Sequence, residues 1–242
     1  MVINNDDKCV SKMFSDGRST IGYLKGVPKK NEFGVRLING VMWVCYGTKK
    51  ILPVEDISIK GNHNISNALA ALAIGKAIGL DNKPMVKVLE RFKGLPHRCE
   101  LVTTINHVDW INDSKGTNPG ATCAAIEGFG KKNNIILIAG GDGKGADFTD
   151  LAKLAYGRVR VAILIGRDAK EIALLLDQSI GIYYAANMDG AVSLANRFAK
   201  TGDLVLLSPA CASLDMFGSY QERGTVFRQA VNRLGNKDKF YA

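Results

Sequence analysis

The chain has 242 residues, of which 46% are hydrophobic and 23% charged, a composition typical of folded globular proteins. Lysine and arginine outnumber aspartate and glutamate by 32 to 23, which gives a formal net charge of +9. This excess fits a basic, well-solvated surface, and it also fits attraction for small anionic ligands. Because no basic tract is interleaved with aromatic residues, we do not expect binding to nucleic acid.

The cysteines are five in number and scattered, and none shows a Cys-x-x-Cys spacing. This pattern argues against a disulfide framework or a zinc site and indicates a reducing cytosol. We find neither a signal-peptide pattern nor an apolar run of about 18 residues, so the sequence gives no sign of secretion or of a membrane span. We therefore expect a cytoplasmic protein.

The first sixty residues are rich in strand-forming patterns. Two strand-like arms within residues 34–45 flank Asn39-Gly40, a dipeptide typical of a tight hairpin. Gly61-Asn-His-Asn64 then begins a helix whose apolar residues recur at helical spacing through Ile78. A second, shorter helix is predicted over residues 83–92.

The segment Gly94-Leu-Pro-His-Arg98 interrupts these patterns and marks the predicted domain boundary. We expect one domain over residues 1–95 and another over residues 96–242. In the second, strand and helix patterns alternate: a hairpin (100–104 with 108–112), helix 119–128, strand 134–139, helix 149–156, strand 159–165, helix 169–176, strand 182–184, helix 188–199, strand 204–207 and helix 222–234. This order predicts an α/β fold with a mainly parallel sheet covered on both faces.

Three polar segments each follow an apolar strand and precede a helix: residues 113–118, 140–148 and 208–217. In open α/β sheets ligands bind at the edge where such segments lie. Together the segments offer cations, hydroxyl groups and glycine-rich backbone, namely Lys115, Lys144, Ser114, Thr117 and Ser213. We expect them to bind phosphates and carboxylates.

The glycine-rich segment formally matches the dinucleotide pattern G-x-G-x-x-A at Gly141–Ala146, but three features count against that interpretation. Asp142 would lie beside a pyrophosphate, the helical pattern begins only near Thr149, and no acidic residue closes the next strand. Flanking glycines favour an anion-binding Lys144 over a merely solvated one. The sequence also contains no G-x-x-x-x-G-K-[ST] loop.

The first segment, Asp113–Asn118, has two interpretations that hold together. Asn118 is expected to cap a helix that starts at Pro119. Asp113 and Lys115, two residues apart after a strand, are expected to project together toward the ligand edge.

Histidines and serines give weaker signals. We interpret His63 and His97 as structural, and no carboxylates at ligand spacing support a metal held by this chain. Ser213 lacks the G-x-S-x-G pattern of serine hydrolases.

Five motifs in order resemble the Mur ligases, the enzymes that assemble the peptide of the peptidoglycan precursor. They are Gly61-Asn-His-Asn-Ile-Ser-Asn-Ala, Gly94-Leu-Pro-His-Arg98, Trp110-Ile-Asn-Asp-Ser-Lys-Gly-Thr-Asn118, Gly140-Gly-Asp-Gly-Lys-Gly-Ala-Asp-Phe148 and Leu207-Ser-Pro-Ala-Cys-Ala-Ser-Leu-Asp-Met-Phe217. The resemblance runs from about Val2 to the C-terminus, and its last motif is most similar to the branch that adds D-glutamate.

The resemblance implies a family of three domains: one that binds UDP, a central ATPase domain and a C-terminal Rossmann-like domain. Residues 1–95 are similar to the end of the central domain and residues 96–242 to the whole C-terminal domain. In the family the P-loop, the carboxylate and histidine that bind Mg²⁺ and a carbamylated lysine lie further upstream. We therefore expect this chain to be a fragment that is inactive by itself.

The resemblance also assigns roles to individual residues. It implies ATP contacts from Asn64, Arg98, Asp113 and Lys115, with Arg98, Asp113 and Lys115 taking part in catalysis. D-Glutamate would be held by the remaining residues of the set, which are Thr117, Lys144, Ser213, Leu214 and Tyr220. In the implied reaction ATP phosphorylates the carboxylate of UDP-N-acetylmuramoyl-L-alanine, and the amine of D-glutamate attacks the acyl phosphate.

Two alternatives remain. One is a related ligase similar to folylpolyglutamate synthase, against which the Ser-Pro-Ala-Cys-Ala-Ser-Leu-Asp segment argues. The other is a Rossmann-like module that binds an anion without catalysis. In each case the expected partners are small molecules, and the protein is expected to act as a monomer.

Overall fold

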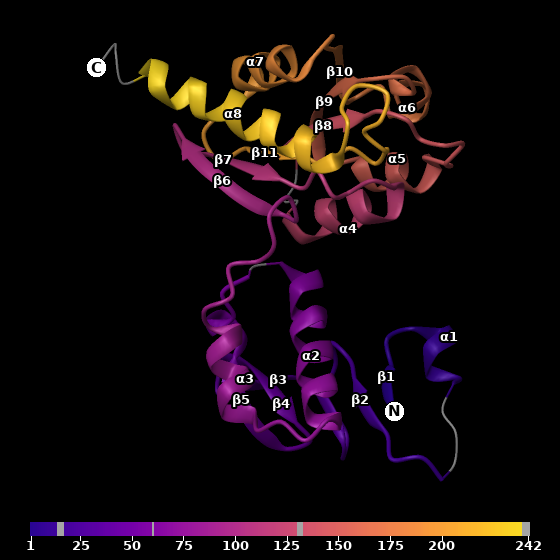
Figure 1. Cartoon of the computed structure of the whole chain (residues 1–242), viewed down its shortest axis with the longest axis vertical. Helices are drawn as coiled ribbons and strands as arrows, with labels where there is room; N and C mark the ends of the chain where they lie inside the picture. Colours follow the sequence, from indigo (N-terminus) through magenta and orange to yellow (C-terminus); the bar gives the residue numbers. More distant parts are fainter. Residues whose placement is uncertain (14–16, 60, 130–132, 239–242) are drawn as a thin grey trace. The chain divides into compact units, whose positions relative to one another are not determined.

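The computed structural model of the chain describes residues 1–13, 17–59, 61–129 and 133–238. The chain divides into two compact units, Met1–Lys93 and Gly94–Ala242 (Figure 1). The assignment of the first unit to the central domain of a Mur ligase stays a prediction.

The N-terminal unit is built on a sheet with the order β1-β2-β3-β4-β5 among the described residues. Its strands are β1 (Val2–Asn4), β2 (Ile21–Tyr23), β3 (Glu32–Ile38), β4 (Val41–Tyr46) and β5 (Lys49–Pro53). The first three run parallel and the last three antiparallel. A short helix α1 (Lys8–Ser11) and a 3₁₀ turn (Val54–Asp56) accompany α2 (Asn62–Ala77) and α3 (Asn82–Leu89). Figure 1 shows α2 and α3 packed beside the strands.

Local chemistry explains the predicted hairpin, which the structure confirms. Asn39 and Gly40 join β3 to β4 with φ values of 51° and 79°, the left-handed conformation that a two-residue turn of this kind requires. Helix α3 is shorter than predicted, because it ends at Leu89 rather than at residue 92. Its last turn tightens as Arg91 donates to the Val88 carbonyl, and Gly94 and Pro96 follow.

The C-terminal unit confirms the predicted α/β class. Its described strands form one sheet in the order β10-β9-β8-β11-β7-β6, in which only β6 runs antiparallel. The strands are β6 (Glu100–Ile105), β7 (Val108–Asn112), β8 (Ile135–Gly140), β9 (Val159–Ile165), β10 (Gly181–Tyr184) and β11 (Leu204–Leu207). The helices are α4 (Pro119–Phe129), α5 (Thr149–Ala155), α6 (Ala169–Leu175), α7 (Met188–Phe198) and α8 (Tyr220–Asp238).

Alternation along the buried strands creates two cores. Ile135, Leu137 and Ala139 of β8 point into the core formed with α4, α5 and α6. Ile136 and Ile138 point to the other face, where α7 and α8 lie. Figure 1 shows these two helical layers on either side of the sheet. Because both faces are covered, the strand ends are the part of the sheet where polar segments reach solvent.

We predict that the C-terminal unit survives limited proteolysis. Between Leu89 and Glu100 the chain has no helix or strand, and Arg91 and Lys93 are exposed. Brief trypsin treatment should therefore cut at these residues and leave a stable fragment that begins near residue 94. Mass spectrometry of the digest identifies the fragment. A stable N-terminal piece with a degraded C-terminal half would contradict the prediction.

Candidate functional site

The site is the edge of the sheet where the parallel strands β7, β11 and β8 end. Leu207, the last residue of β11, lies opposite both Asn112 of β7 and Ile138 of β8. The three polar segments singled out in the sequence leave from this edge. The structure therefore brings together the segments that the sequence predicted to meet.

Backbone hydrogen bonds join the segments to one another. Ala210 donates to the Gly116 carbonyl at 2.9 Å, and Gly140 donates to the Pro209 carbonyl at 2.8 Å. Asp142 and Ala212 exchange two bonds of 3.1 and 2.8 Å, which makes a small antiparallel bridge. Because Ser213 and Lys144 follow this bridge on its two sides, their backbone positions are fixed relative to each other.

The glycine-rich loop depends on a close approach of two backbones. Gly141 has a φ of 130°, and a Cβ atom there would lie 2.2 Å from the Ala212 carbonyl oxygen. Lys144 also takes a left-handed φ of 54°, and its amide donates to Asp142 Oδ1 at 3.0 Å. The Lys144 side chain is exposed. The loop thus holds a flexible ammonium group on a fixed backbone.

Asp142 has a supporting role in the same loop. Its Oδ2 pairs with Arg167 Nη1 at 3.2 Å, on the loop after β9. Asp168 on that loop accepts the Gly143 amide at 2.6 Å, and the Arg167 amide donates to Asp215 Oδ2 at 2.8 Å. These carboxylates connect three loops to each other.

Asp113 does not project toward the ligand edge with Lys115, so that prediction is wrong. Its side chain is 7% exposed. Oδ2 accepts from Ser208 Oγ at 2.7 Å, and Oδ1 accepts from the Cys99 amide at 3.2 Å. Ser208 Oγ also lies 3.1 Å from Thr122 Oγ1. Buried hydroxyl and amide donors satisfy the carboxylate and turn it inward.

Burial dominates the electrostatics of this carboxyl group. It raises the pKa of Asp113, while the hydrogen bonds from Ser208 and Cys99 and the charge of Arg98 lower it. Arg98 itself is exposed. The nearby cation therefore remains accessible to an anionic ligand.

The remaining predicted residues surround the loop 113–117. The Lys115 ammonium lies 4.6 Å from the centre of the Tyr220 ring, a cation–π contact. Thr117 is half-buried, and its amide donates to the Lys115 carbonyl at 2.8 Å. Ser213 is 4% exposed, whereas Leu214 is 67% exposed. As predicted, Asn118 caps α4, since its Oδ1 accepts the Ala121 amide at 2.9 Å.

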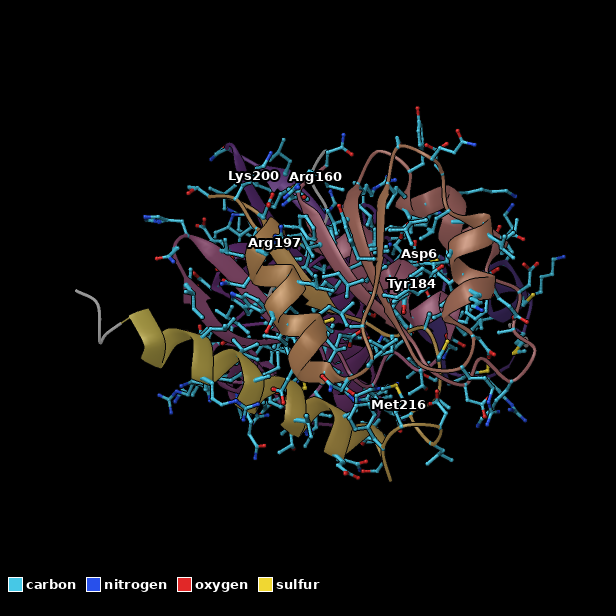
Figure 2. All side chains as sticks on the ribbon, turned by 90° about the horizontal axis from the view of Figure 1, so that it is seen from above. Asp6, Arg160, Tyr184, Arg197, Lys200 and Met216 are labelled. Carbon is cyan, nitrogen blue, oxygen red and sulfur yellow. The ribbon has the colours of Figure 1, made fainter. Side chains whose placement is uncertain are left out.

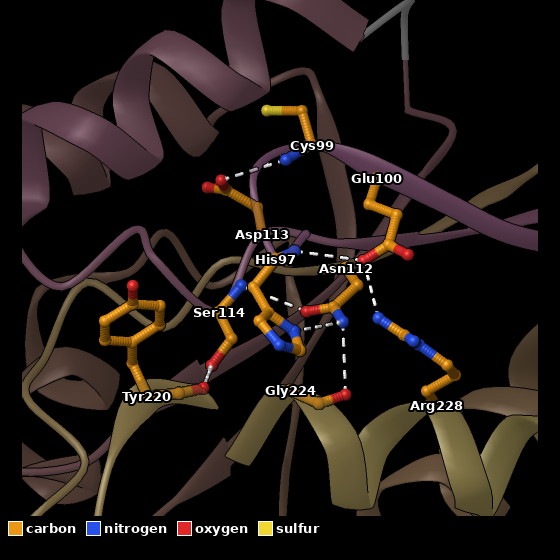
Figure 3. A network of polar contacts seen from close by, with 9 residues as sticks. All are labelled: His97, Cys99, Glu100, Asn112, Asp113, Ser114, Tyr220, Gly224 and Arg228. Carbon is orange, nitrogen blue, oxygen red and sulfur yellow. Dashed lines mark hydrogen bonds and ion pairs between the residues drawn. The ribbon is translucent and has the colours of Figure 1, made fainter. Parts of the chain in front are cut away.

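His97 is held inside a polar network (Figure 3). Asn112 accepts the Ser114 amide through Oδ1 and donates through Nδ2 to the Gly224 carbonyl at 3.1 Å and to His97 Nδ1 at 3.0 Å. His97 Nδ1 is therefore an acceptor, and the ring proton lies on Nε2. The pKa of His97 is lowered, mainly by burial and also by the charge of Arg228. The charge of Glu100 and the hydrogen bond with Asn112 oppose this shift. A Cβ at Gly224 would lie 2.2 Å from Nδ1, so only glycine fits there.

Arg223, the largest fully buried polar side chain of the site, was not predicted from the sequence. It is 1% exposed and donates to Ser114 and to Cys211. One signal was available: Arg223 lies four residues before the buried Phe227 on α8, so it falls on the buried face of that helix. Ser208, Thr122 and Asn112 were missed as well, because each gains its role only from distant neighbours.

Asn64 belongs to the N-terminal unit, in the first turn of α2, where its Oδ1 accepts from Asn67 Nδ2 at 3.2 Å. Within the part of the chain that the structure describes, no three His, Cys, Asp or Glu side chains come together as metal ligands. Among the same residues, no helix is both long and apolar enough to cross a membrane.

Comparison with known proteins agrees with this arrangement. Residues 97–211 match the glutamate ligase domain of the Mur ligases. The chain belongs to the Mur ligase family. A protein of Nitrosococcus oceani named UDP-N-acetylmuramoylalanine–D-glutamate ligase is 46% identical over 234 residues, which cover 97% of this chain and 52% of that protein. One of the same name from Acinetobacter baylyi is 43% identical over 240 residues, 97% of this chain and 54% of that protein.

Solved structures show the same fold at low identity. The UDP-N-acetylmuramate–alanine ligase of Thermotoga maritima gives a TM-score of 0.64 at 18% identity, covering 98% of this chain and 51% of that one. The MurF ligase of the same organism, solved in complex with ADP, gives 0.66 at 14% identity, covering 96% and 53%. This Mur ligase chain thus spans about half the length of the curated relatives it matches.

The raised pKa of Asp113 predicts a specific pH dependence. A carboxyl group whose pKa is higher in the folded state favours folding when protonated. Its contribution is complete below the ordinary value of 3.8 and is lost as the pH rises through the folded value. Asp113→Asn should therefore flatten this fall in the free energy of unfolding above about pH 4. Urea unfolding at a series of pH values measures it.

Asp147 provides a control of opposite sign. Hydrogen bonds from the Thr149 hydroxyl and amide lower the pKa of this exposed carboxyl. Its contribution is present above the ordinary value and is lost as the pH falls through the folded value. Asp147→Asn should remove a loss of stability at low pH.

If Asp113→Asn left the pH profile of the free energy of unfolding unchanged, the prediction that burial raises the pKa of Asp113 would be contradicted.

Proposed function

We propose that this chain supplies the D-glutamate site and part of the ATP site of a ligase that adds D-glutamate to UDP-N-acetylmuramoyl-L-alanine. The observation that carries the proposal is that identity to proteins of that name extends over 97% of the chain and includes the loops joined at the strand edge. The exposed cations and buried backbone of that edge suit anionic substrates. The proposed enzyme would use ATP and small-molecule substrates, and it would act in peptidoglycan synthesis in the cytoplasm.

In the proposed reaction an oxygen of the muramoyl-alanine carboxylate attacks the γ-phosphorus of ATP and releases ADP. The α-amine of D-glutamate then attacks the acyl carbon, the bond to the phosphate oxygen breaks, and the nitrogen loses a proton as the amide forms. Arg98 and Lys115 would neutralise phosphate charge as it develops. Mg²⁺ would share that task, held by residues in the part of the longer relatives that this chain does not match.

The resemblance to the Mur ligases suggests a role for each residue, and the contacts of the loops are compatible with these roles. Lys144 would bind a carboxylate of D-glutamate, with Thr117, Ser213, Leu214 and Tyr220 shaping the same subsite. On the ATP side, Asp113 would act from its buried position by fixing the loop that carries Lys115, and each of its oxygens keeps a lone pair for a further donor. Asn64 would contact ATP from the N-terminal unit.

Substitution of the two lysines tests this division. In the 242-residue chain, Lys144→Ala should weaken binding of D-glutamate roughly ten- to a hundred-fold, because a charge-assisted contact contributes about 1.5–3 kcal/mol. Lys115→Ala should instead weaken binding of ATP. NMR titrations with each ligand measure both effects.

Lys153→Ala is a matched control, since this lysine is exposed on α5 and pairs only weakly with Asp150 at 3.7 Å. It should change neither affinity. If Lys144→Ala reduced ATP binding and left D-glutamate binding intact, the assignment of the two loops would be wrong.

We also predict that the chain alone does not form the product. Its sequence contains no P-loop, whose backbone amides and lysine hold the transferred phosphoryl group in ATPases of this type. A phosphate-release assay with ATP, UDP-N-acetylmuramoyl-L-alanine and D-glutamate should show no rate above a protein-free blank. ATP-dependent release that requires both other substrates would refute the prediction.

A further inference from the structure

One buried guanidinium group joins the two loops that carry the candidate nucleotide and amino-acid ligands. Arg223, in the first turn of α8, donates through Nε to Ser114 Oγ at 3.0 Å and through Nη2 to the Ser114 carbonyl at 2.9 Å. Through Nη1 it donates to the Cys211 carbonyl at 3.1 Å. Ser114 precedes Lys115 on the loop after β7, and Cys211 lies two residues before Ser213 on the loop after β11.

Stability alone does not explain a cation at this position. Burial of a charge is costly, and a positive charge in the first turn of a helix opposes the helix dipole. Burial lowers the pKa of Arg223 to about 10, so the group stays charged at neutral pH. Asp113 and Asp215, on the same two loops, favour the charged form. An apolar side chain of similar size would commonly be as stabilising at a buried site.

The geometry of the contacts explains the arginine better than its charge does. Its three hydrogen bonds end on neutral oxygens, two of them main-chain carbonyls, and they run in the directions of a planar fork. A lysine has one nitrogen and cannot span these acceptors together. The side chain therefore sets the distance between two backbone segments.

We propose that Arg223 is a positioning residue that fixes the loop 113–117 against the loop 208–215, and with it the spacing between Lys115 and Ser213. The importance of Arg223 for catalysis rests on the proposed function. Its role in joining the two loops is independent of that function. The residue acts through the two loops and does not touch a substrate.

The first arm of the test needs no ligand. Amide hydrogen exchange is followed by NMR in the 242-residue chain and in its Arg223→Lys and Arg223→Met variants, with folding checked by circular dichroism. Both variants should exchange at least about ten-fold faster at residues 114–117 and 211–214, because local opening becomes easier. The Gly143 amide, held by Asp168, should keep the wild-type rate.

Arg160→Met serves as the matched control. Arg160 is a partly buried arginine that pairs with Asp203, and it lies at the other end of the strands from the loop that carries Met216 (Figure 2). Its loss should lower global stability and leave the exchange of the two loops at the wild-type rate once global unfolding is subtracted.

The second arm titrates the same proteins with D-glutamate. Arg223→Lys should weaken binding about ten-fold although it keeps the charge, because the fork that sets the loop spacing is lost. Unchanged exchange in the loops, or an increase spread evenly over the sheet, would overturn the proposal. Faster exchange with unchanged affinity would overturn the positioning role.

If the wild-type chain bound no D-glutamate, the proposed function of the chain would fail separately. The exchange arm would then decide by itself whether Arg223 joins the loops.

Discussion

The position of β11 between β7 and β8 is the constraint on which the site depends. All three strands run parallel, and the end of β11 at Leu207 is level with Asn112 and Ile138. Three loops from distant parts of the sequence therefore begin side by side, and backbone bonds such as those between Asp142 and Ala212 join them. A register shift of β11 by one residue would exchange its two faces and misplace the loop that follows.

The site combines a rigid buried base with exposed cations. Asp113, Ser208, Asn112 and Arg223 are almost fully buried and hydrogen-bonded to one another's loops. Arg98, in the segment before β6, and Lys144, on the loop after β8, are exposed. Such an arrangement holds the backbone in place before a ligand arrives and leaves long side chains free to reach it, which lowers the entropy lost on binding. We interpret these buried groups as support for the loops and these exposed cations as ligand contacts.

Much of the fold could be predicted because its signals are local. Asn39-Gly40 specified a hairpin, and alternating apolar runs specified the parallel sheet and the loops at its edge. The direction of Asp113 could not be predicted, because its partner Ser208 is 95 residues away in the sequence. The same holds for Arg223, which bonds to Ser114 at a separation of 109 residues. Helical spacing could have placed Arg223 on a buried face, but no local pattern shows which distant groups these two side chains bond to.

The location of bound D-glutamate on this chain would test the proposed site most directly. NMR chemical-shift mapping of the isotope-labelled protein during a titration would provide it. We expect the largest shifts at the amides of residues 116–117, 143–145 and 213–214, on the three loops of the strand edge. Shifts concentrated instead in the groove lined by Lys153, Tyr156 and Asp177, between α5 and α6, would contradict it.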